Sequence, residues 1–207
     1  LFDAVEEKEA LDKIDDGPDQ NIITNIESSF SDLYYKKAME IDKIKVMIVG
    51  QDPYPTNSNG VAFCKDSYYE LFQPDCSGGI VLNSMGISKE RAREISRKNP
   101  KNLFYDLLDN FGICFINVFH KLYDSLSIED IRSAAEEARL VNLPLLEKSE
   151  NIILLGKGKT KSTFERYYPE ISYNHVLIHP SPKARAGNEV EWSETWESQK
   201  LSKLIIS

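Results

Sequence analysis

The sequence predicts an α/β fold in which a central four-stranded parallel sheet is sandwiched between helices. Four short apolar runs have the length and composition of buried strands, and segments with helical periodicity lie between them. Strands that alternate with helices form parallel sheets, because each helix returns the chain across a face of the sheet. The four runs are Ile44–Val49, Ile113–Phe119, Asn151–Leu155 and Val176–Ile178.

Helices are expected on both sides of the first strand. Ser29–Ile41 places apolar side chains at helical spacing. Asp66–Gly79 is rich in Gly, Pro, Ser and Asp, so we expect a loop there, with a helix opening at Ile80–Met85. Pro100–Asn110 predicts a further helix, which Gly112 closes.

The second half of the chain adds two more helical segments. Ser127–Glu147 opens with a cap-like Ser127-x-x-Asp130 and continues as an amphipathic helix, which Pro144 either bends or splits. The segment from Glu189 onward is also expected to be helical. Its apolar stripe should lie in the core and consists of Trp192, Trp196 and Leu201.

Most of the acidic excess lies at the N-terminus. The formal net charge is −8, but residues 1–20 hold eight acidic and two basic side chains, so the remaining 187 residues carry only −2. We expect an acidic leader over residues 1–20 and a single domain over residues 21–207. Net acidity normally argues against nucleic acid as a partner, but the concentration of acidic residues at the N-terminus weakens this argument. Two locally basic stretches, Ser88–Lys101 and Gly156–Arg166, are either solvated faces or contacts with nucleic acid.

The three cysteines stand far apart, without a Cys-x-x-Cys pattern. Their odd number and spacing suit neither a disulfide framework nor a zinc site, so we expect free thiols and a metal-free intracellular protein, cytoplasmic or nuclear. They are Cys64, Cys76 and Cys114, and two of them lie in or beside apolar runs, where burial is expected. No apolar run approaches the roughly 20 residues of a membrane span. Residues 1–6 lack the basic and apolar regions of a signal peptide.

The most informative segment is Gly50–Pro55, with the sequence Gly-Gln-Asp-Pro-Tyr-Pro. Two prolines remove hydrogen-bond donors and fix φ, so the strand must end there on a stiff loop. That loop holds polar side chains at the carboxyl end of a strand, where open α/β sheets bind their ligands. The Asp52 carboxylate there either caps a turn, or orients a water and stabilises a developing cation.

Polar residues also end two other strands. Asn117 interrupts an apolar strand and is either a structural tie to the backbone or a donor and acceptor for the edge of a nucleobase. His179 stands between an apolar strand and two prolines, a setting that favours a functional role. His120 and His175 lack that setting and are expected to be structural.

The third strand is followed by Gly156–Ser162, which invites comparison with a phosphate-binding loop. The Walker pattern requires glycine where Ile153 stands, so a nucleoside triphosphatase is excluded. The backbone amides and Lys157 remain candidates for contact with a nucleic-acid phosphate.

Taken together, these motifs resemble the uracil-DNA glycosylase superfamily, and most closely its family 1. They occur in the family's order and span about two thirds of the chain. The matching segments are Gly50–Tyr54, Gly60–Phe63, Asn117, Gly156-Lys157 and His179–Pro182.

The resemblance implies a reaction in which a uracil nucleotide is flipped out of DNA and its C1′–N bond is hydrolysed, leaving an abasic site. Asp52 would position the water and stabilise the oxocarbenium-like sugar. His179, as a neutral imidazole, would stabilise the negative charge that develops on the uracil O2. No cofactor and no metal is implied.

The resemblance also implies a uracil pocket made by four residues. The backbone of Gln51 would donate to the base, and Asn117 would read its O4 and N3 edge. Phe63 would stack on the ring, and Tyr54 would exclude the C5 methyl group of thymine.

Contacts with DNA are expected from Pro55, Gly156, Lys157, Ser181, Lys183 and Arg185. Three of these positions depart from the family. Pro55 stands where family 1 usually has histidine, and Lys157 replaces the serine of a Gly-Ser loop. Lys183 replaces the leucine that fills the gap left by the flipped base, so either Lys183 or Arg185 must serve as the wedge.

Two functions remain open from the sequence. The first is an active, monomeric glycosylase that acts on uracil in single- or double-stranded DNA. The alternative is a non-catalytic module that uses the same pocket to bind uracil-containing DNA, or that binds a protein partner. A damaged pyrimidine or a purine is a third substrate class, and Tyr54 and Asn117 both argue against it.

Overall fold

A four-stranded parallel sheet forms the centre of the protein. The structure, a computed structural model, describes residues 32–55, 59–97, 99–122, 127–198 and 200–206, so the predicted acidic leader lies outside the described residues. The strand order is β2-β1-β3-β4, which confirms the predicted sheet. The strands are β1 (Ile44–Gly50), β2 (Ile113–Asn117), β3 (Ser149–Leu155) and β4 (His175–Leu177).

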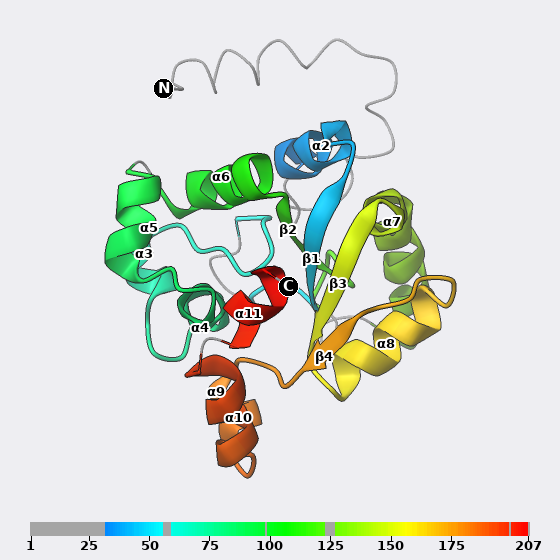
Figure 1. Cartoon of the computed structure of the whole chain (residues 1–207). Coiled ribbons are helices and arrows are strands. Elements are labelled where there is room, and N and C mark those ends of the chain that lie inside the picture. Colours follow the sequence, from blue (N-terminus) through cyan, green and yellow to red (C-terminus); the bar gives the residue numbers. More distant parts are fainter. Residues whose placement is uncertain (1–31, 56–58, 98, 123–126, 199, 207) are drawn as a thin grey trace.

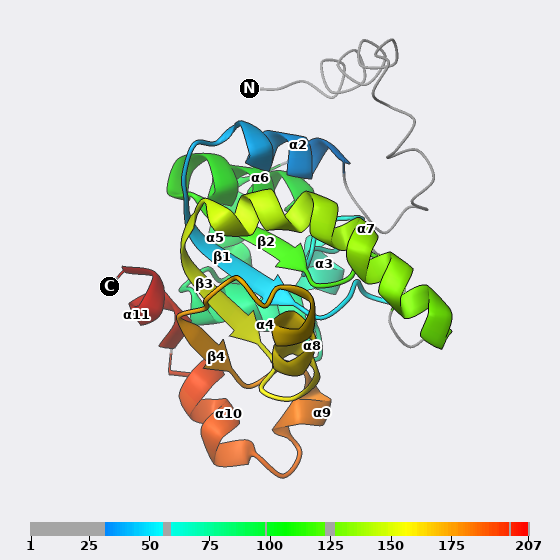
Figure 2. The same cartoon turned by 90° about the vertical axis from the view of Figure 1, so that its right-hand side faces the viewer.

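Helices cover both faces of this sheet. Figure 1 shows α3 to α6 and α11 on one side, with α7 and α8 on the other. In the turned view, α7 and α8 cross the sheet face, while α9 and α10 lie beyond it (Figure 2). The helices are α2 (Asp32–Glu40), α3 (Tyr68–Leu71), α4 (Ser77–Ser84), α5 (Lys89–Ile95), α6 (Pro100–Phe111), α7 (Ile128–Glu147), α8 (Lys159–Tyr167), α9 (Pro182–Arg185), α10 (Glu189–Trp196) and α11 (Lys200–Ile206).

The predicted caps and breaks explain where α6 and α7 begin and end. Gly112 ends α6 in the left-handed region with φ = 67°, a conformation that glycine adopts without steric cost. The Ser127 hydroxyl accepts a hydrogen bond from the Asp130 backbone amide at the start of α7. Pro144 lies inside α7, which continues as one helix to Glu147, so it does not split the helix.

The predicted loop over Asp66–Gly79 is wrong in part. It contains the short helix α3, and α4 begins at Ser77, three residues before the expected start. Gly78 and Gly79 suggested a loop, but both lie inside α4 and allow it to pack closely against neighbouring backbone. A Cβ on Gly78 would lie 1.9 Å from the Phe63 carbonyl oxygen, and one on Gly79 would lie 2.2 Å from the Leu71 carbonyl oxygen. Only glycine allows α4 to approach these segments so closely.

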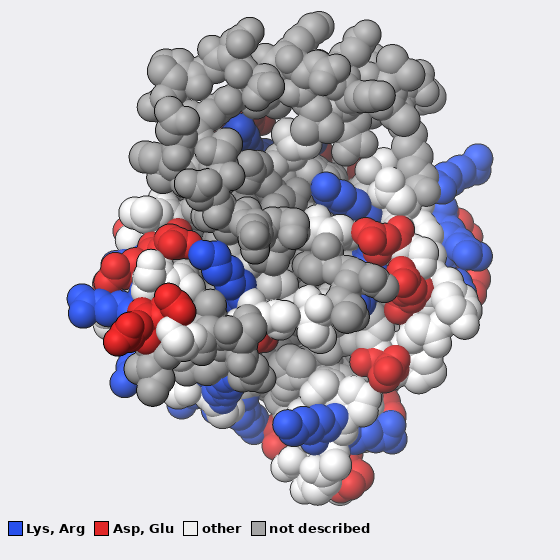
Figure 3. Space-filling view, turned by 180° about the vertical axis from the view of Figure 1, so that it is seen from behind, with Lys and Arg blue, Asp and Glu red and all other residues white. Residues whose placement is uncertain are grey.

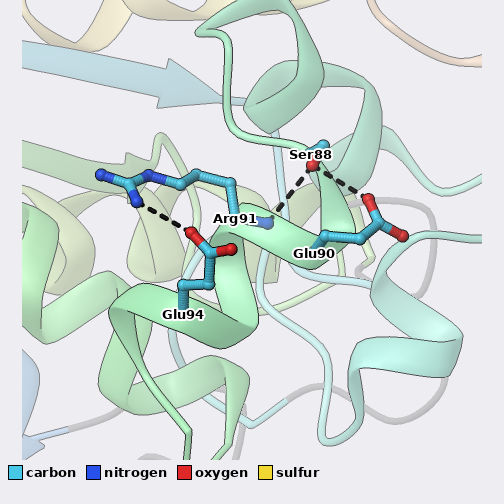
Figure 4. Close-up of polar contacts among 4 residues, drawn as sticks. All are labelled: Ser88, Glu90, Arg91 and Glu94. Carbon is cyan, nitrogen blue, oxygen red and sulfur yellow. Dashed lines mark hydrogen bonds and ion pairs between the residues drawn. The ribbon is translucent and has the colours of Figure 1, made fainter.

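Part of the basic stretch Ser88–Lys101 is a self-paired helical surface. The Ser88 hydroxyl accepts a hydrogen bond from the Arg91 amide and donates one to Glu90, while Arg91 pairs with Glu94 at 2.8 Å (Figure 4). All four side chains are solvent-exposed. These contacts favour the interpretation of this turn as a solvated face, since one of its three cations, Arg91, is paired locally and all four side chains lie in solvent.

The C-terminal helices close the core as predicted. Trp192, Trp196 and Leu201 are buried, and the Ser84 hydroxyl of α4 donates to the Thr195 carbonyl at 3.3 Å. The three cysteines are free and buried, as expected for structural thiols. None of the helices in the described part of the chain has the length and apolar character that a membrane crossing requires. The described residues also contain no His, Cys, Asp or Glu cluster suited to a metal ion.

Candidate active site

The loops that follow β1, β3 and β4 surround a cavity of about 420 Å³. The strands are parallel, so their carboxyl ends meet at one edge of the sheet. Helices α9 and α10 form the outer wall. The cavity is lined by Gln51, Asp52, Gly156, Lys157, Gly158, Lys159, Thr160, Ile178, His179, Ala184, Asn188 and Glu191. Five predicted site residues from three motifs thus share one cavity: Gln51 and Asp52, Gly156 and Lys157, and His179.

The Gln51 side chain is the most unusual group in this cavity. It is 7% exposed, and neither its amide nitrogen nor its amide oxygen has a hydrogen-bond partner within the described residues. Buried amides are almost always paired, because an unpaired one costs about 1–3 kcal/mol. A donor and an acceptor held unpaired in a cavity are therefore suited to a polar ligand.

The backbone beside Gln51 is held rigidly. The Val118 amide donates to the Gly50 carbonyl at 3.0 Å, and the Phe119 amide donates to the Gln51 carbonyl at 3.0 Å. These bonds continue the pairing of β1 and β2 past the strand ends. The partly exposed Asp52 follows directly and lines the same cavity. The backbone that carries its carboxylate is therefore anchored on its N-terminal side.

His179 presents a neutral imidazole to the cavity. Burial lowers the pKa of His179 below its ordinary value, which favours the uncharged ring at neutral pH. Its Nδ1 accepts a hydrogen bond from the Ser181 backbone amide at 3.1 Å. A neutral imidazole carries one N–H, so this bond leaves the proton on Nε2. The ring is thus fixed as a donor through Nε2.

Phe63 and Asn117 lie together on the backbone of Gly50, outside the residues that line the cavity. A Cβ on Gly50 would lie 2.5 Å from the Asn117 Oδ1 and 2.7 Å from the Phe63 Cζ. Asn117 is 7% exposed, and its side-chain amide makes no hydrogen bond with the described part of the chain. A ring and an unpaired amide therefore stand next to the Gln51 loop.

The backbone of Phe63 is strained. Its φ is 64°, and no other described residue apart from glycine has a positive φ. This region is a true outlier for a bulky side chain, and such strain is often found at binding sites. The following amide, that of Cys64, donates to the Val61 carbonyl at 3.2 Å and closes the turn.

Tyr54 does not line the cavity and is anchored instead to the start of α4. Its phenol oxygen accepts a hydrogen bond from the Gly78 amide at 2.8 Å and lies 3.4 Å from the Cys76 Sγ. Burial raises the pKa of Tyr54 well above its ordinary value, so the phenol stays protonated. The Lys65 ammonium lies 3.9 Å from the centre of the ring.

The loop after β3 has the conformation that its glycines allow. Gly156 has φ = 132°, and a Cβ there would lie 2.4 Å from the Thr160 Oγ1. Gly158 caps α8 without a side-chain hydrogen bond, so the start of the helix offers backbone amides at the cavity wall. The exposed Lys157 is paired with Glu191 of α10.

Of the remaining candidate DNA contacts, some are exposed and others are engaged in contacts within the protein. Pro55 and Lys183 are exposed, and Lys183 has no ion-pair partner in the described ranges. Arg185 is engaged, because its guanidinium lies 4.7 Å from the Trp192 ring centre and 3.6 Å from the Glu197 carboxylate. Ser181 accepts from the Ala184 amide and thereby caps α9.

The sequence did not indicate Thr160, Asn188 or Glu191 as cavity residues. Asn188 and Glu191 reach the cavity only through the packing of the C-terminal helices, for which no local motif exists. On the face seen in Figure 3, basic and acidic side chains are interspersed and form no single basic patch.

Comparisons with known proteins find likeness only among solved structures. No protein-family model and no curated protein matches the sequence. A tyrosine-to-glycine mutant of UNG from Nitratifractor salsuginis is 16% identical, with 95% of this chain and 98% of that chain covered and a TM-score of 0.46. Wild-type UNG from the same organism is 15% identical, with 96% and 98% covered and a TM-score of 0.43. With so few shared residues, function has to follow from the site itself.

Proposed function

We propose that the chain is a uracil-DNA glycosylase of the family 1 type, which hydrolyses the N-glycosidic bond of deoxyuridine in DNA. The observation that carries this proposal is the cavity shared by an unpaired Gln51 amide, the Asp52 carboxylate and the neutral His179. These groups match the charges that develop when a pyrimidine leaves a sugar. The motif pattern of the sequence adds the substrate, uracil in DNA.

Asp52 and His179 divide the chemistry. As the C1′–N1 bond breaks, its electron pair moves onto the uracil ring and the sugar becomes cationic. The carboxylate of Asp52 stabilises that cation and accepts the proton of the water that attacks C1′. The Nε2–H of His179 donates to the uracil O2, where negative charge gathers. A neutral donor suits this role, since it keeps its proton throughout.

Recognition of the base is assigned to the residues around Gly50. The Phe63 ring provides a stacking surface, and the Asn117 amide pairs with the O4 and N3 edge. The Gln51 backbone and side chain add further hydrogen bonds. Tyr54, fixed by its bond to Gly78, excludes the C5 methyl group of thymine.

The loops around the cavity would contact the DNA backbone, within one domain over residues 21–207. The backbone amides at the start of α8, together with Lys157, suit a phosphate, whereas the Gly156 amide already donates to the Leu177 carbonyl at 2.8 Å. Pro55, Ser181 and Lys183 border the same edge. Lys183 is the better candidate for the wedge, because Arg185 is held by Trp192 and Glu197.

The test is uracil release from a single-stranded oligonucleotide with one deoxyuridine, followed by alkali cleavage. Asp52→Asn is expected to lower the single-turnover rate by at least about 10²-fold and to leave DNA affinity nearly unchanged. Asp66→Asn, an exposed position, serves as the matched control and should retain the wild-type rate. Equal rates for wild type and Asp52→Asn would end the catalytic assignment.

A non-catalytic module on the same fold is the second candidate. The pairing of Lys157 with Glu191 favours the form of this module that binds a protein partner, because the pair opposes the approach of a DNA phosphate. Neither form would release a base from the uracil oligonucleotide, and only a DNA-binding form would bind it in preference to its thymine counterpart.

A further inference from the structure

Asn142 lies in the interior of the protein, behind the carboxyl end of β2. Its side chain comes from α7 and is 0% exposed. Its Nδ2 donates to the Asn117 carbonyl at 2.8 Å and to the Tyr168 hydroxyl at 2.9 Å. Its Oδ1 accepts a hydrogen bond from the His120 Nε2, which lies 3.1 Å away. One amide thus ties α7 to β2 and to the end of α8.

The bond from Asn142 gives the Asn117 carbonyl a hydrogen-bond partner that no neighbouring strand provides. β2 is an edge strand, so the Asn117 carbonyl has no neighbouring strand on its outer side. A buried carbonyl without a partner would be costly. The Asn142 amide fills that place, and it is itself fully paired, a condition under which buried polar networks specify one geometry.

The same peptide group is held at both ends. The carbonyl of Asn117 accepts from Asn142, and the amide of Val118, in the same peptide plane, donates to the Gly50 carbonyl at 3.0 Å. Because a peptide group is planar, two such bonds fix its rotation. That rotation sets the direction of the Asn117 side chain, whose Oδ1 packs on Gly50 beside Phe63.

We infer that Asn142 is a positioning residue for base recognition, which acts by holding the Asn117–Val118 peptide plane. The inference rests on the proposed function, in which Asn117 reads the uracil edge. Without this anchor the peptide plane can rotate and carry the Asn117 amide away from the base. A misplacement of about 1 Å in a catalytic site can cost about 10²-fold in rate.

The experiment compares uracil release with cytosine release, since the two bases differ at the edge that Asn117 reads. Asn142→Ala and Asn142→Leu both remove the donor to Asn117, and leucine keeps the branched shape of the side chain. We expect each to lower uracil release by about 10- to 100-fold and to reduce the preference for uracil over cytosine. Ser84→Ala is the matched control, because Ser84 is also 0% exposed and hydrogen-bonded between helices but does not contact the site.

Two further measurements keep the inference open to refutation. Tyr168→Phe keeps the ring that stacks on Phe164 and removes only one partner of Asn142, so it should shift the base preference in the same direction by a smaller factor. Urea denaturation identifies conditions in which every variant is folded. A wild-type base preference in folded Asn142 variants would overturn the inference, as would an equal loss in Ser84→Ala.

The positioning role of Asn142 can also be tested without glycosylase activity. If the wild-type protein releases no uracil, the proposed function fails, and Asn142 is judged by the side-chain amide resonances of Asn117 in nitrogen-15 NMR spectra. Resonances that shift in Asn142→Ala but not in Ser84→Ala would support the positioning role. Unchanged resonances would refute it.

Discussion

Replacing Gly50 with alanine would displace two of the side chains assigned to base recognition, those of Asn117 and Phe63. The added Cβ would lie 2.5 Å from the Asn117 Oδ1 and 2.7 Å from the Phe63 Cζ, whereas ordinary contact begins at 3.4 Å. The amide must therefore withdraw by about 0.9 Å and the ring by about 0.7 Å. Gly50 has no positive φ, so alanine can adopt its backbone and the effect is purely steric.

The expected consequences are separate for stability and for rate. Overpacking of this kind costs about 1–3 kcal/mol of unfolding free energy. A shift of nearly 1 Å in the reading group should lower the rate of uracil release by about 10²-fold. The assay is single-turnover release from a single-stranded oligonucleotide, at a temperature where circular dichroism shows the variant folded.

A stability-matched control separates these two effects. Gly86 has φ = 81° and open space around it, so Gly86→Ala costs about 1 kcal/mol in backbone strain without a collision. It should therefore lose stability and keep the wild-type rate. The reasoning is refuted if folded Gly50→Ala releases uracil within about threefold of wild type, or if both variants slow equally.

Three further predictions concern DNA contacts and pH. Lys183→Leu should raise uracil release from duplex DNA more than from single strands, because an apolar side chain can fill the gap left by a flipped base; an equal change on both substrates would assign the wedge elsewhere. Glu191→Gln frees Lys157 from its ion pair and should tighten DNA binding about 3- to 10-fold at low salt, an effect that fades as salt rises. Fluorescence anisotropy measures it, with the exposed Glu194→Gln on the same helix as control, and unchanged affinity would contradict it. Burial lowers the pKa of His120 to about 4 from an ordinary 6.5, so the unfolded chain binds a proton between these values that the folded chain does not. Unfolding free energy should therefore fall by about 3 kcal/mol as pH drops from 6.5 to 4; His120→Gln should flatten this part of the profile, and an unchanged slope would contradict the assignment.

Strands β1 and β2 were predictable because almost all of their residues are buried, on both faces of the sheet. Ile44–Val49 and Ile113–Phe119 are apolar runs that alternate with helices, and the structure places strands at both, ending the second at Asn117. The helices were less certain where glycine served packing. Gly78 and Gly79 indicated a loop, yet they lie inside α4, since only the folded structure reveals the carbonyl oxygens that they approach.

The candidate site was predictable to the extent that parallel topology fixes it. Gln51, Asp52 and His179 follow strand ends, and they line one cavity. Phe63 and Asn117 were expected in the pocket from the resemblance, but their position on Gly50, outside the cavity lining, depends on packing that the sequence does not show. Glu191 likewise reaches the cavity from a helix far along the chain.

The strained backbone of Phe63 has an evolutionary consequence. At φ = 64° glycine or asparagine would adopt this backbone with less strain than an aromatic residue. The Phe63 ring is nevertheless buried in the core, where its centre lies 6.3 Å from that of Phe115. Its removal would relieve about 1–2 kcal/mol of backbone strain and lose about 3–5 kcal/mol of packing. Core packing and base stacking therefore select for the same ring, and a lineage that loses it should lose stability together with base recognition.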